Sequence, residues 1–426
     1  MAVGLATVSP YLDRFSDLLR RTAGEPLWLR HRRESAMERF LALGVPTARD
    51  EEYKYTDLSA LAGGEQLFAP GGTAAAPAAP PFEGEAAAIR FGAGPSLRGF
   101  KRPGVRVLSL QGALRAEPGL VEEHLGTIAP QPEGHALSAL NTALFERAVI
   151  VVTEPGAAVN DPIHVVYGDG YEDRHPRVLV VARPNSSVQV IETYTGAGTY
   201  WRNAVTEIRT EANARVDHCR AQIESETAFH TGLVQGLQDR DSYVASFSLS
   251  FGAKVARNDI GTRLDGAGCE CALDGLYAVR ASQHVDHHTA IDHAKPHCNS
   301  HQLYKGVLDG RAKGVFNGKI FVRRDAQKTD AVQNNKNLLL SDQAEVNTKP
   351  QLEIDANDVR CTHGATIGQL DATAAFYLRS RGISAAHARS ILTYAFAADA
   401  LDRVRDEAVR EHFRSLLRTR FAGEDG

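Results

Sequence analysis

The feature that most constrains the fold of this chain is a turn-and-strand pattern that returns at a nearly fixed interval. Val188, Val216 and Val244 each follow a short turn that begins with Asn or Asp, and these valines lie 28 residues apart. A glycine-rich turn before Cys271 continues the series. A fixed period of about 20–50 residues is typical of stacked supersecondary units. The pattern predicts a mainly β fold with a parallel β-helix core, whose coils pair with the coils on either side.

An antiparallel β-sandwich is the alternative, because short β-branched runs separated by Gly, Asn and Asp suit both architectures. The turns of a sandwich would come about every 8–12 residues. The strand pattern alone leaves both folds open.

Helical periodicity appears on both sides of the β region. We expect an N-terminal helical region over 1–62, a Gly/Ala/Pro-rich linker over 63–81, a mixed region over 82–147, the β-helix core over 148–371 and a C-terminal helical domain over 372–426. Apolar residues of the last region recur at three- and four-residue spacing. A region this short cannot build its own core, so it must pack on the sheet or on a partner.

Charge and hydropathy exclude several classes of protein. The chain has 48 Lys and Arg against 52 Asp and Glu, so no overall basic field exists to hold nucleic acid or an anionic membrane. Its apolar runs are far shorter than the roughly 20 residues that a membrane-spanning helix needs, and the N-terminus lacks the features of a signal peptide. Five cysteines without a CxxC pair indicate free thiols in a reducing compartment. We expect a soluble, cytoplasmic protein.

No nucleotide-binding loop is recognisable. The segment from Gly314 to Ile320 is one residue short of a Walker A loop and lacks its Ser/Thr. Its Asn317-Gly318 dipeptide is typical of a tight turn between strands. We therefore expect no ATP hydrolysis by this chain.

Histidines are concentrated in one stretch, with six of the sixteen lying between His284 and His301. Alternate residues of a strand share a face, so the histidines and aspartates of 283–293 could bind zinc or iron. A solvated row of polar residues would look the same, and no established metal-binding spacing is present.

A second candidate site is the pair Cys361 and His363. In an extended strand both side chains project from the same face, and sulfur with imidazole suits iron, an iron–sulfur cluster or zinc. Two ligands do not complete a four-coordinate site, so a partner chain would supply the rest. The alternative is a cysteine packed as a small apolar residue beside a hydrogen-bonded histidine.

Long strings of the C-terminal half resemble the SufB/SufD family of iron–sulfur cluster assembly proteins. These strings are QLYKGVLDGRAKGVFNGKI, AQKTDAVQNNKNLLLSDQAEVNTKPQLEIDANDVRCTHGATIGQLD and FYLRSRGIS, and QHVDHHTAIDH upstream also fits. PTARDEEYKYTDL near the N-terminus is similar to a motif of the SufD branch. Residues 337–340 lie where SufB carries a cysteine, and His363-Gly364 stands where SufB has His-Glu, which also favours the SufD branch.

The resemblance implies a right-handed parallel β-helix with helical domains at both ends. It implies a non-catalytic scaffold that pairs with SufB through the β-helix ends and docks the SufC ATPase on its C-terminal helices. His363 would contribute to a nascent, transient cluster shared with SufB, with Cys361 as a tentative second ligand. A reduced flavin belongs to the complex, but no residue here locates it. The isolated chain is a possible homodimer.

Two other classes remain open. Parallel β-helices also serve as polysaccharide lyases and acyltransferases, although this chain shows neither a hexapeptide repeat nor an aromatic sugar platform. A pure interaction protein without a metal role is the third possibility.

Overall fold

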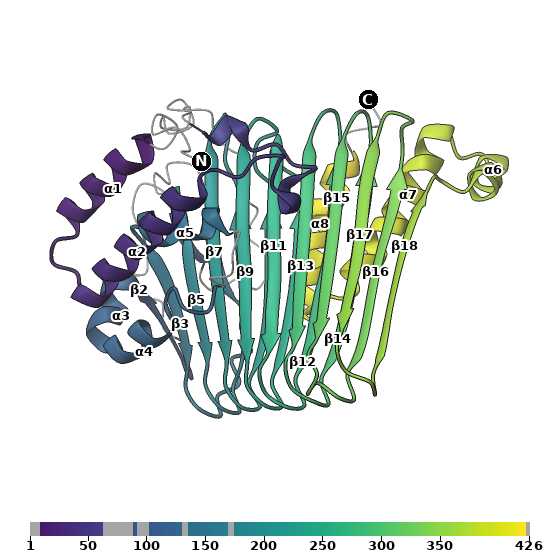
Figure 1. Ribbon diagram of the computed structural model, residues 1–426. Helices are drawn as coiled ribbons and strands as arrows, with labels where there is room; N and C mark the ends of the chain where they lie inside the picture. The colour runs from purple at the N-terminus through teal and green to yellow at the C-terminus, as the bar shows by residue number, and fades with distance from the viewer. Residues whose placement is uncertain (1–8, 63–87, 92–101, 130–134, 169–173, 423–426) are drawn as a thin grey trace.

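The structure is a computed structural model that describes residues 9–62, 88–91, 102–129, 135–168 and 174–422. Its centre is a solenoid of two nine-stranded sheets (Figure 1). Sheet A consists, in spatial order, of β1 (Ala88–Phe91), β4 (Ile163–Tyr167), β6 (Ser187–Tyr194), β8 (Arg215–Gln222), β10 (Tyr243–Ser250), β12 (Glu270–Val279), β14 (Asn299–Leu308), β16 (Asp330–Leu339) and β18 (Arg360–Gly368). Sheet B consists of β2 (Val105–Ser109), β3 (Ala148–Thr153), β5 (Arg177–Ala182), β7 (Trp201–Thr210), β9 (Phe229–Gln238), β11 (Val255–Leu264), β13 (His284–His293), β15 (Lys313–Val322) and β17 (Glu345–Ile354). The linker predicted over 63–81 lies outside the described residues.

Strand register explains the sequence period. Val188 is the Cα partner of Val216, Val216 of Val244, and Val244 of Cys271, so residues one period apart stack on consecutive coils. The named strands pair in parallel except β2 with β3. The parallel β-helix prediction is therefore confirmed, and the antiparallel sandwich is wrong.

The turns that enter sheet A repeat one backbone conformation. In successive coils the residue at this corner has a positive φ: Asn185, Asn213, Asp241, Gly268, His297 and Lys328. Asn and Asp tolerate this left-handed region better than most residues do. The N–H of Asn213 donates to Arg240 O at 3.1 Å, and the same bond recurs from coil to coil. These stacked turns are the reason for the recurring Asn and Asp in the sequence.

The interior of the solenoid places large side chains opposite glycines. A Cβ at Gly275 would lie 2.4 Å from the Tyr304 ring, and one at Gly306 would lie 2.3 Å from the Tyr277 ring. Gly318 likewise leaves space for Gln333 Nε2. Asn317-Gly318 lies inside β15 and not at a turn, so the tight-turn prediction for this dipeptide is wrong. Its glycine is needed for close approach between coils.

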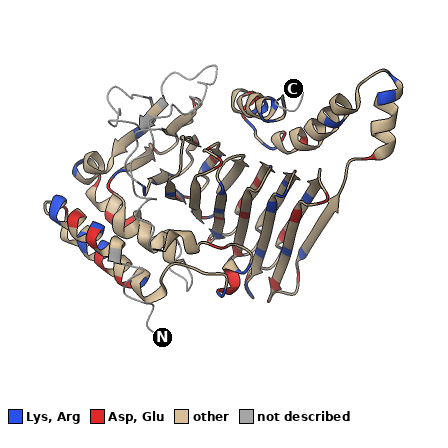
Figure 2. Cartoon of the chain, turned by 90° about the horizontal axis from the view of Figure 1, so that it is seen from above, with Lys and Arg blue, Asp and Glu red and all other residues tan. Residues whose placement is uncertain are grey.

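The last two C-terminal helices cover the outer face of sheet A. The helices are α6 (Ala372–Ser380), α7 (Ala385–Leu401) and α8 (Glu407–Ala422). Leu401, Val404 and Leu417 are buried against apolar side chains of β6, β8, β10, β12 and β14. This region therefore leans on the sheet, as its length requires. Helix α6 has no buried residue and stands clear of both sheets (Figures 1 and 2).

The N-terminal part covers sheet B. Helices α1 (Ser9–Arg21), α2 (Leu27–Leu43) and α5 (Ala136–Leu144) share a core with Trp201 and Phe229 of β7 and β9. Two short helices, α3 (Leu110–Ala116) and α4 (Pro118–His124), pack beside β2 and β3. After α2 the chain runs through two 3-10 turns, Glu51–Tyr53 and Ser59–Leu61. In the described ranges no helix is long and apolar enough to cross a membrane.

Candidate functional site

The solenoid ends in two strands, β17 and β18, that have no further strand beside them in the described part of the chain. Glu345 N donates to Ala312 O and Asp355 N to Val322 O, so odd-numbered amides of β17 point to β15. Backbone groups of a strand alternate in direction, and the even-numbered amides of β17 therefore point away from the solenoid. The same alternation aims the odd-numbered amides of β18 outward, since Arg360 N donates to Thr329 O.

Both candidate ligands lie on the inner face of β18. Cys361 continues a stack of buried residues that includes Ala331 and Ser300, while His363 continues the stack of Gln333 and Gln302. No coil covers this layer, so Cys361 is half-buried and His363 is exposed. Strand alternation thus brings the two residues to one face, at the open end.

The two residues differ in chemistry. Cys361 packs against the apolar interior, and burial raises the pKa of its thiol, with Asp330 adding to the shift. A protonated thiol is a poor metal ligand. Beside His363, Gly364 leaves space, because a Cβ there would meet only Asn334 Oδ1 at 3.2 Å. Among the residues that the structure describes, no group of three His, Cys, Asp or Glu is arranged to hold a metal ion. An iron site that uses His363 therefore needs ligands from elsewhere.

The histidine-rich strand β13 is divided between two environments. His287 and His293 are fully buried in the interior, where burial lowers their pKa values to about 3 and about 4. His284, Asp286 and His288 lie on the outer face and are covered by the N-terminal segment. Residues so divided cannot converge on one ion.

We call residues Glu51–Thr56 the strap, because they cross the outer face of β11, β13, β15 and β17. Thr56 Oγ1 donates to Asp286 Oδ2 at 2.5 Å and lies 2.9 Å from His284 Nε2. Glu52 Oε1 accepts from Lys319 Nζ at 2.5 Å, and Lys349 Nζ lies 3.0 Å from Glu51 Oε1. Lys349 belongs to the terminal strand β17, so the strap ties the N-terminal segment to the open end.

Charge pairing fixes the ionisation of the strap contacts. The hydrogen bond from His288, followed by that from Lys319, lowers the pKa of Glu52 to about 2. Burial opposes the charge on His288, yet Asp286 and Glu52 raise its pKa above the ordinary value. Arg257 reaches Asp286 at 2.7 Å and Glu52 O at 2.7 Å. The outer histidines therefore hold the strap in place.

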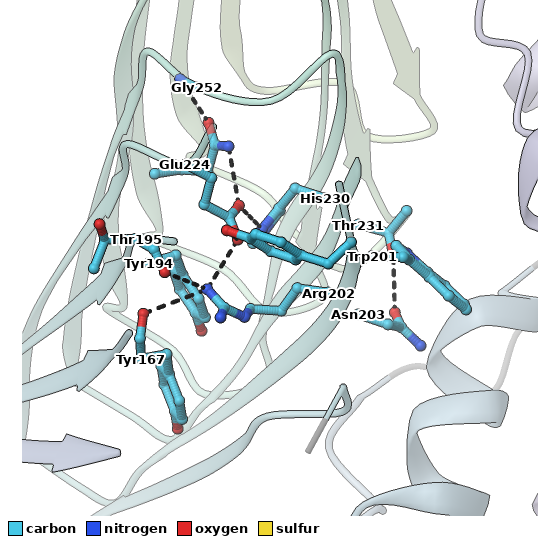
Figure 3. A network of polar contacts seen from close by, with 12 residues as sticks. Tyr167, Tyr194, Thr195, Trp201, Arg202, Asn203, Glu224, His230, Thr231 and Gly252 are labelled. Carbon is cyan, nitrogen blue, oxygen red and sulfur yellow. Dashed lines mark hydrogen bonds and ion pairs between the residues drawn. The ribbon is translucent and has the colours of Figure 1, made fainter. Parts of the chain in front are cut away.

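Inside the solenoid lies a polar network that the sequence did not reveal (Figure 3). Glu224 accepts from Arg202 Nη1 at 2.9 Å and from Tyr200 at 3.0 Å, and lies 2.6 Å from His230 Nδ1. Burial opposes the carboxylate charge, but His230 and Arg202 lower the pKa of Glu224 to about 2, while burial lowers the pKa of His230 to about 4. The network pairs an ionised carboxylate with an arginine and braces consecutive coils.

The positions of these residues explain why sequence reasoning missed them. Glu224 and Arg202 are separated by 22 residues and meet only because one coil closes on the next. Arg202 lies in β7, but Glu224 lies in the connection between β8 and β9, so strand alternation does not pair them. Lys and Arg positions are interspersed with Asp and Glu positions along the helices and strands (Figure 2).

Comparison with known proteins places this geometry in a family. Residues 165–396 match the SufBD core domain of the SUF system for FeS cluster assembly. The chain is 32% identical to the iron–sulfur cluster assembly SufBD family protein slr0076 of Synechocystis, over 88% of this chain and 87% of that protein. It is 29% identical to the iron–sulfur cluster assembly protein SufD of Escherichia coli, over 91% and 92% of the two chains, and 27% identical to SufD of Bacillus subtilis, over 75% and 74%. The chain belongs to the SufB/SufD family of iron–sulfur cluster assembly proteins, and its similarity extends to the SufD members.

Proposed function

We propose that this chain is a non-catalytic scaffold subunit of a cytoplasmic SufBCD complex. It pairs with SufB through the open end of the solenoid, docks the SufC ATPase on its C-terminal helices, and contributes His363 to a nascent iron–sulfur cluster that both subunits share. The observation that carries the proposal is the position of His363 on β18, an edge strand whose outward backbone groups face no further strand among the described residues. Such an edge is a template for strand pairing with another chain.

The two edge strands differ as templates. Pro350 removes one outward donor from β17, whereas β18 contains no proline. Ile354 and Ile367 are 40% and 51% exposed at this end and supply apolar surface for a partner. In the absence of SufB the same edges are available to a second copy of the chain, so a homodimer of the isolated protein belongs to the proposal.

Iron content of the co-expressed complex tests the proposal. SufB and SufC are co-expressed with the wild-type chain, without it, or with Leu352→Pro. Leu352 and Pro350 are both even-numbered residues of β17, so the backbone N–H of Leu352 points away from the solenoid. Proline at residue 352 therefore removes a donor from the free edge and leaves the hydrogen bonds to β15 intact. We expect cluster content to depend on the chain, and the proline variant to weaken co-purification at least tenfold.

A matched control separates backbone pairing from packing, because Leu352 also touches the apolar interior. Leu352→Ala loses that contact and keeps the N–H, so it should retain most of the partner binding. Equal iron content with and without the chain would contradict the scaffold role. Equal binding by the proline and alanine variants would contradict edge pairing.

The most exposed large apolar side chains of the C-terminal region lie on α6. Phe376 and Tyr377 are 70% and 57% exposed, whereas the stripe of α7 and α8 is covered by sheet A. Exposed aromatic residues of this kind are typical of interaction sites. We therefore place the SufC docking surface on α6 and the adjoining start of α7.

The double variant Phe376→Ala/Tyr377→Ala should weaken SufC binding at least tenfold without changing the circular dichroism spectrum. Both side chains lie outside the core, so the fold does not depend on them. Leu27, which is 73% exposed at the other end of the molecule, provides the control Leu27→Ala. Isothermal titration with SufC measures the affinities, and an unchanged affinity of the double variant would exclude this surface.

In the part of the chain that the structure describes, we find no distinctive binding site for the reduced flavin that the resemblance implies. A cavity of about 720 Å³ lies over the outer face of β9–β15. Arg263 and Arg323 line this cavity and both form ion pairs with Asp292, at 3.3 and 2.8 Å. Their charges are therefore already paired with a carboxylate and do not form a dedicated phosphate-binding site. We assign no flavin step to this subunit.

A further inference from the structure

Two of the five cysteines stack directly on each other. Cys269 follows the left-handed turn residue Gly268, and Cys298 follows the equivalent His297 one coil later. The next residues of the two strands, Glu270 and Asn299, are Cα partners, and Asn299 N donates to Cys269 O at 2.9 Å. Neighbouring strands lie about 4.8 Å apart. This separation falls within the Cα range of about 4.4–6.8 Å that a disulfide requires.

The two thiols share an environment. Cys269 Sγ contacts Gly266 O at 3.1 Å, and Cys298 Sγ contacts the same oxygen at 3.3 Å. The two sulfur atoms are also in hydrogen-bond contact with each other, which lowers the pKa of Cys269 to about 7 and raises that of Cys298. Cys269 is therefore the more acidic thiol of the pair, and its sulfur also contacts Asp239 O at 2.9 Å.

Packing at this position does not require sulfur. The same corner of other coils holds Ser186, Ser242 and Thr329, and each hydroxyl donates to the carbonyl three residues earlier, at 2.6, 2.6 and 2.8 Å. Cys269 makes the same contact to Gly266 O. A hydroxyl is sufficient for this hydrogen bond to the carbonyl. Two adjacent thiols add a chemical property that serine lacks, which is the ability to form a disulfide.

We propose that Cys269 and Cys298 form a redox-active dithiol that low-molecular-weight disulfides, such as glutathione disulfide, convert into an intramolecular disulfide. The Cys269 thiolate attacks one sulfur of the oxidant, which forms a mixed disulfide and releases one thiolate. Cys298 then loses its proton and attacks Cys269 Sγ, which forms the protein disulfide and releases the second thiolate. The protein loses two electrons and two protons, and the oxidant becomes two thiols.

The site lies close to the surface. Both side chains are buried at the edge of the interior cluster and also contact Asp239 O and Pro296 O, respectively. Asp265 and Ala267, in the corner that adjoins them, are exposed. The other cysteines differ. Cys219 is buried beneath the C-terminal helices, and Cys271 stacks on Val244 and Ser300. The disulfide would link consecutive coils across the corner.

Thiol counting with the full-length chain tests the proposal. The reduced protein is incubated with glutathione disulfide, quenched with N-ethylmaleimide, denatured and titrated. We expect the free thiols to fall from five to three, and tryptic peptides 264–280 and 281–305 to be joined by a reducible bond. Cys269→Ser, which keeps the corner contact, should retain all four remaining thiols. Cys298→Ser lacks the resolving thiol and should stop at the mixed disulfide, with three free thiols and one glutathione adduct on Cys269.

Because peptide 264–280 contains two cysteines, Cys271→Ser is the discriminating variant. It should still lose two thiols and form the linked peptides. A linked pair that persists in Cys269→Ser would overturn the assignment, as would five free thiols in the oxidised wild type. In the wild type, loss of thiols as glutathione adducts without linked peptides would also overturn it.

Discussion

Replacing His363 with alanine is expected to leave the co-expressed complex intact and to abolish its iron–sulfur cluster. His363 is an exposed imidazole on the inner face of the last strand, and imidazole is a common iron ligand. One exposed side chain is a small part of an interface built on two edge strands, so the assembly should survive. The measurements are iron and sulfide content with the visible absorption spectrum, and gel filtration of the complex.

Two further variants make this experiment specific. Cys361→Ala should reduce the cluster content less, because burial keeps this thiol protonated and packed against the interior. His301→Ala removes another exposed histidine of the same sheet and should have no effect. A full cluster in His363→Ala would exclude ligation by His363, and equal losses in the histidine and cysteine variants would make Cys361 a ligand.

Lowering the pH from 7 to 5 is expected to reduce the free energy of unfolding by several kcal/mol. Four buried histidines have pKa values lowered by burial: His175 to about 3, His230 to about 4, His287 to about 3 and His293 to about 4. The unfolded chain binds protons at these positions near pH 6.5 and the folded chain does not, so stability is lost as the pH falls below that value. Each histidine contributes up to about 2 kcal/mol at pH 5.

Other groups act differently in this window. The depressed pKa values of Glu52 and Glu224, both about 2, stabilise the fold above pH 4.5 and lose that effect only at lower pH. His288 has a raised pKa, so its contribution is fully present below pH 6.5 and declines as the pH rises through the folded pKa. Asp274, whose pKa burial raises to about 6, acts in the same direction as His288. His124, His135 and His284, whose pKa values burial also lowers, act with the four histidines, so the net effect of acid is destabilising.

His287→Phe isolates one of these contributions. The imidazole lies between the rings of Tyr277 and Tyr304, at 5.4 and 5.2 Å, and in the described structure neither of its nitrogens has a hydrogen-bond partner. Phenylalanine keeps the ring contacts and removes two buried polar atoms. Urea unfolding should show unchanged or greater stability at pH 7, and an acid-induced loss that is about 2 kcal/mol smaller. His301→Phe, at an exposed position, should leave the pH dependence unaltered; a parallel loss in both variants would contradict the account.

Two local rules, the repeat of the turns and the alternation of side chains along a strand, were enough to predict the fold and the shared face of the candidate site. The spacing of Val188, Val216 and Val244 reflects stacked corners, because each coil repeats one left-handed turn. Strand alternation put Cys361 and His363 on one face before any register was known. Both rules depend on neighbours in sequence or on a repeat, which a single chain displays directly.

Contacts between distant segments were beyond those rules. Thr56 donates a hydrogen bond to Asp286, which is 230 residues away in sequence, and no feature of the strap sequence predicts this partner. His287 and His288 are adjacent in sequence and lie on opposite faces, so the histidine cluster looked like one site and is two environments. Asn317-Gly318 has the composition of a turn, and only the neighbouring coil shows that its glycine accommodates Gln333.

The terminal position of β17 and β18 has a consequence for cooperativity. In a solenoid each layer is stabilised mainly by the layers next to it, so order propagates along one dimension. Inner layers have two such neighbours, and the layer that contains His363 has one. Fraying therefore begins at this layer, and a docked subunit acts as the missing neighbour. If the proposed partner docks here, the free energy of association is in part a free energy of local folding, which would couple the order of the layer that contains His363 to the presence of that partner.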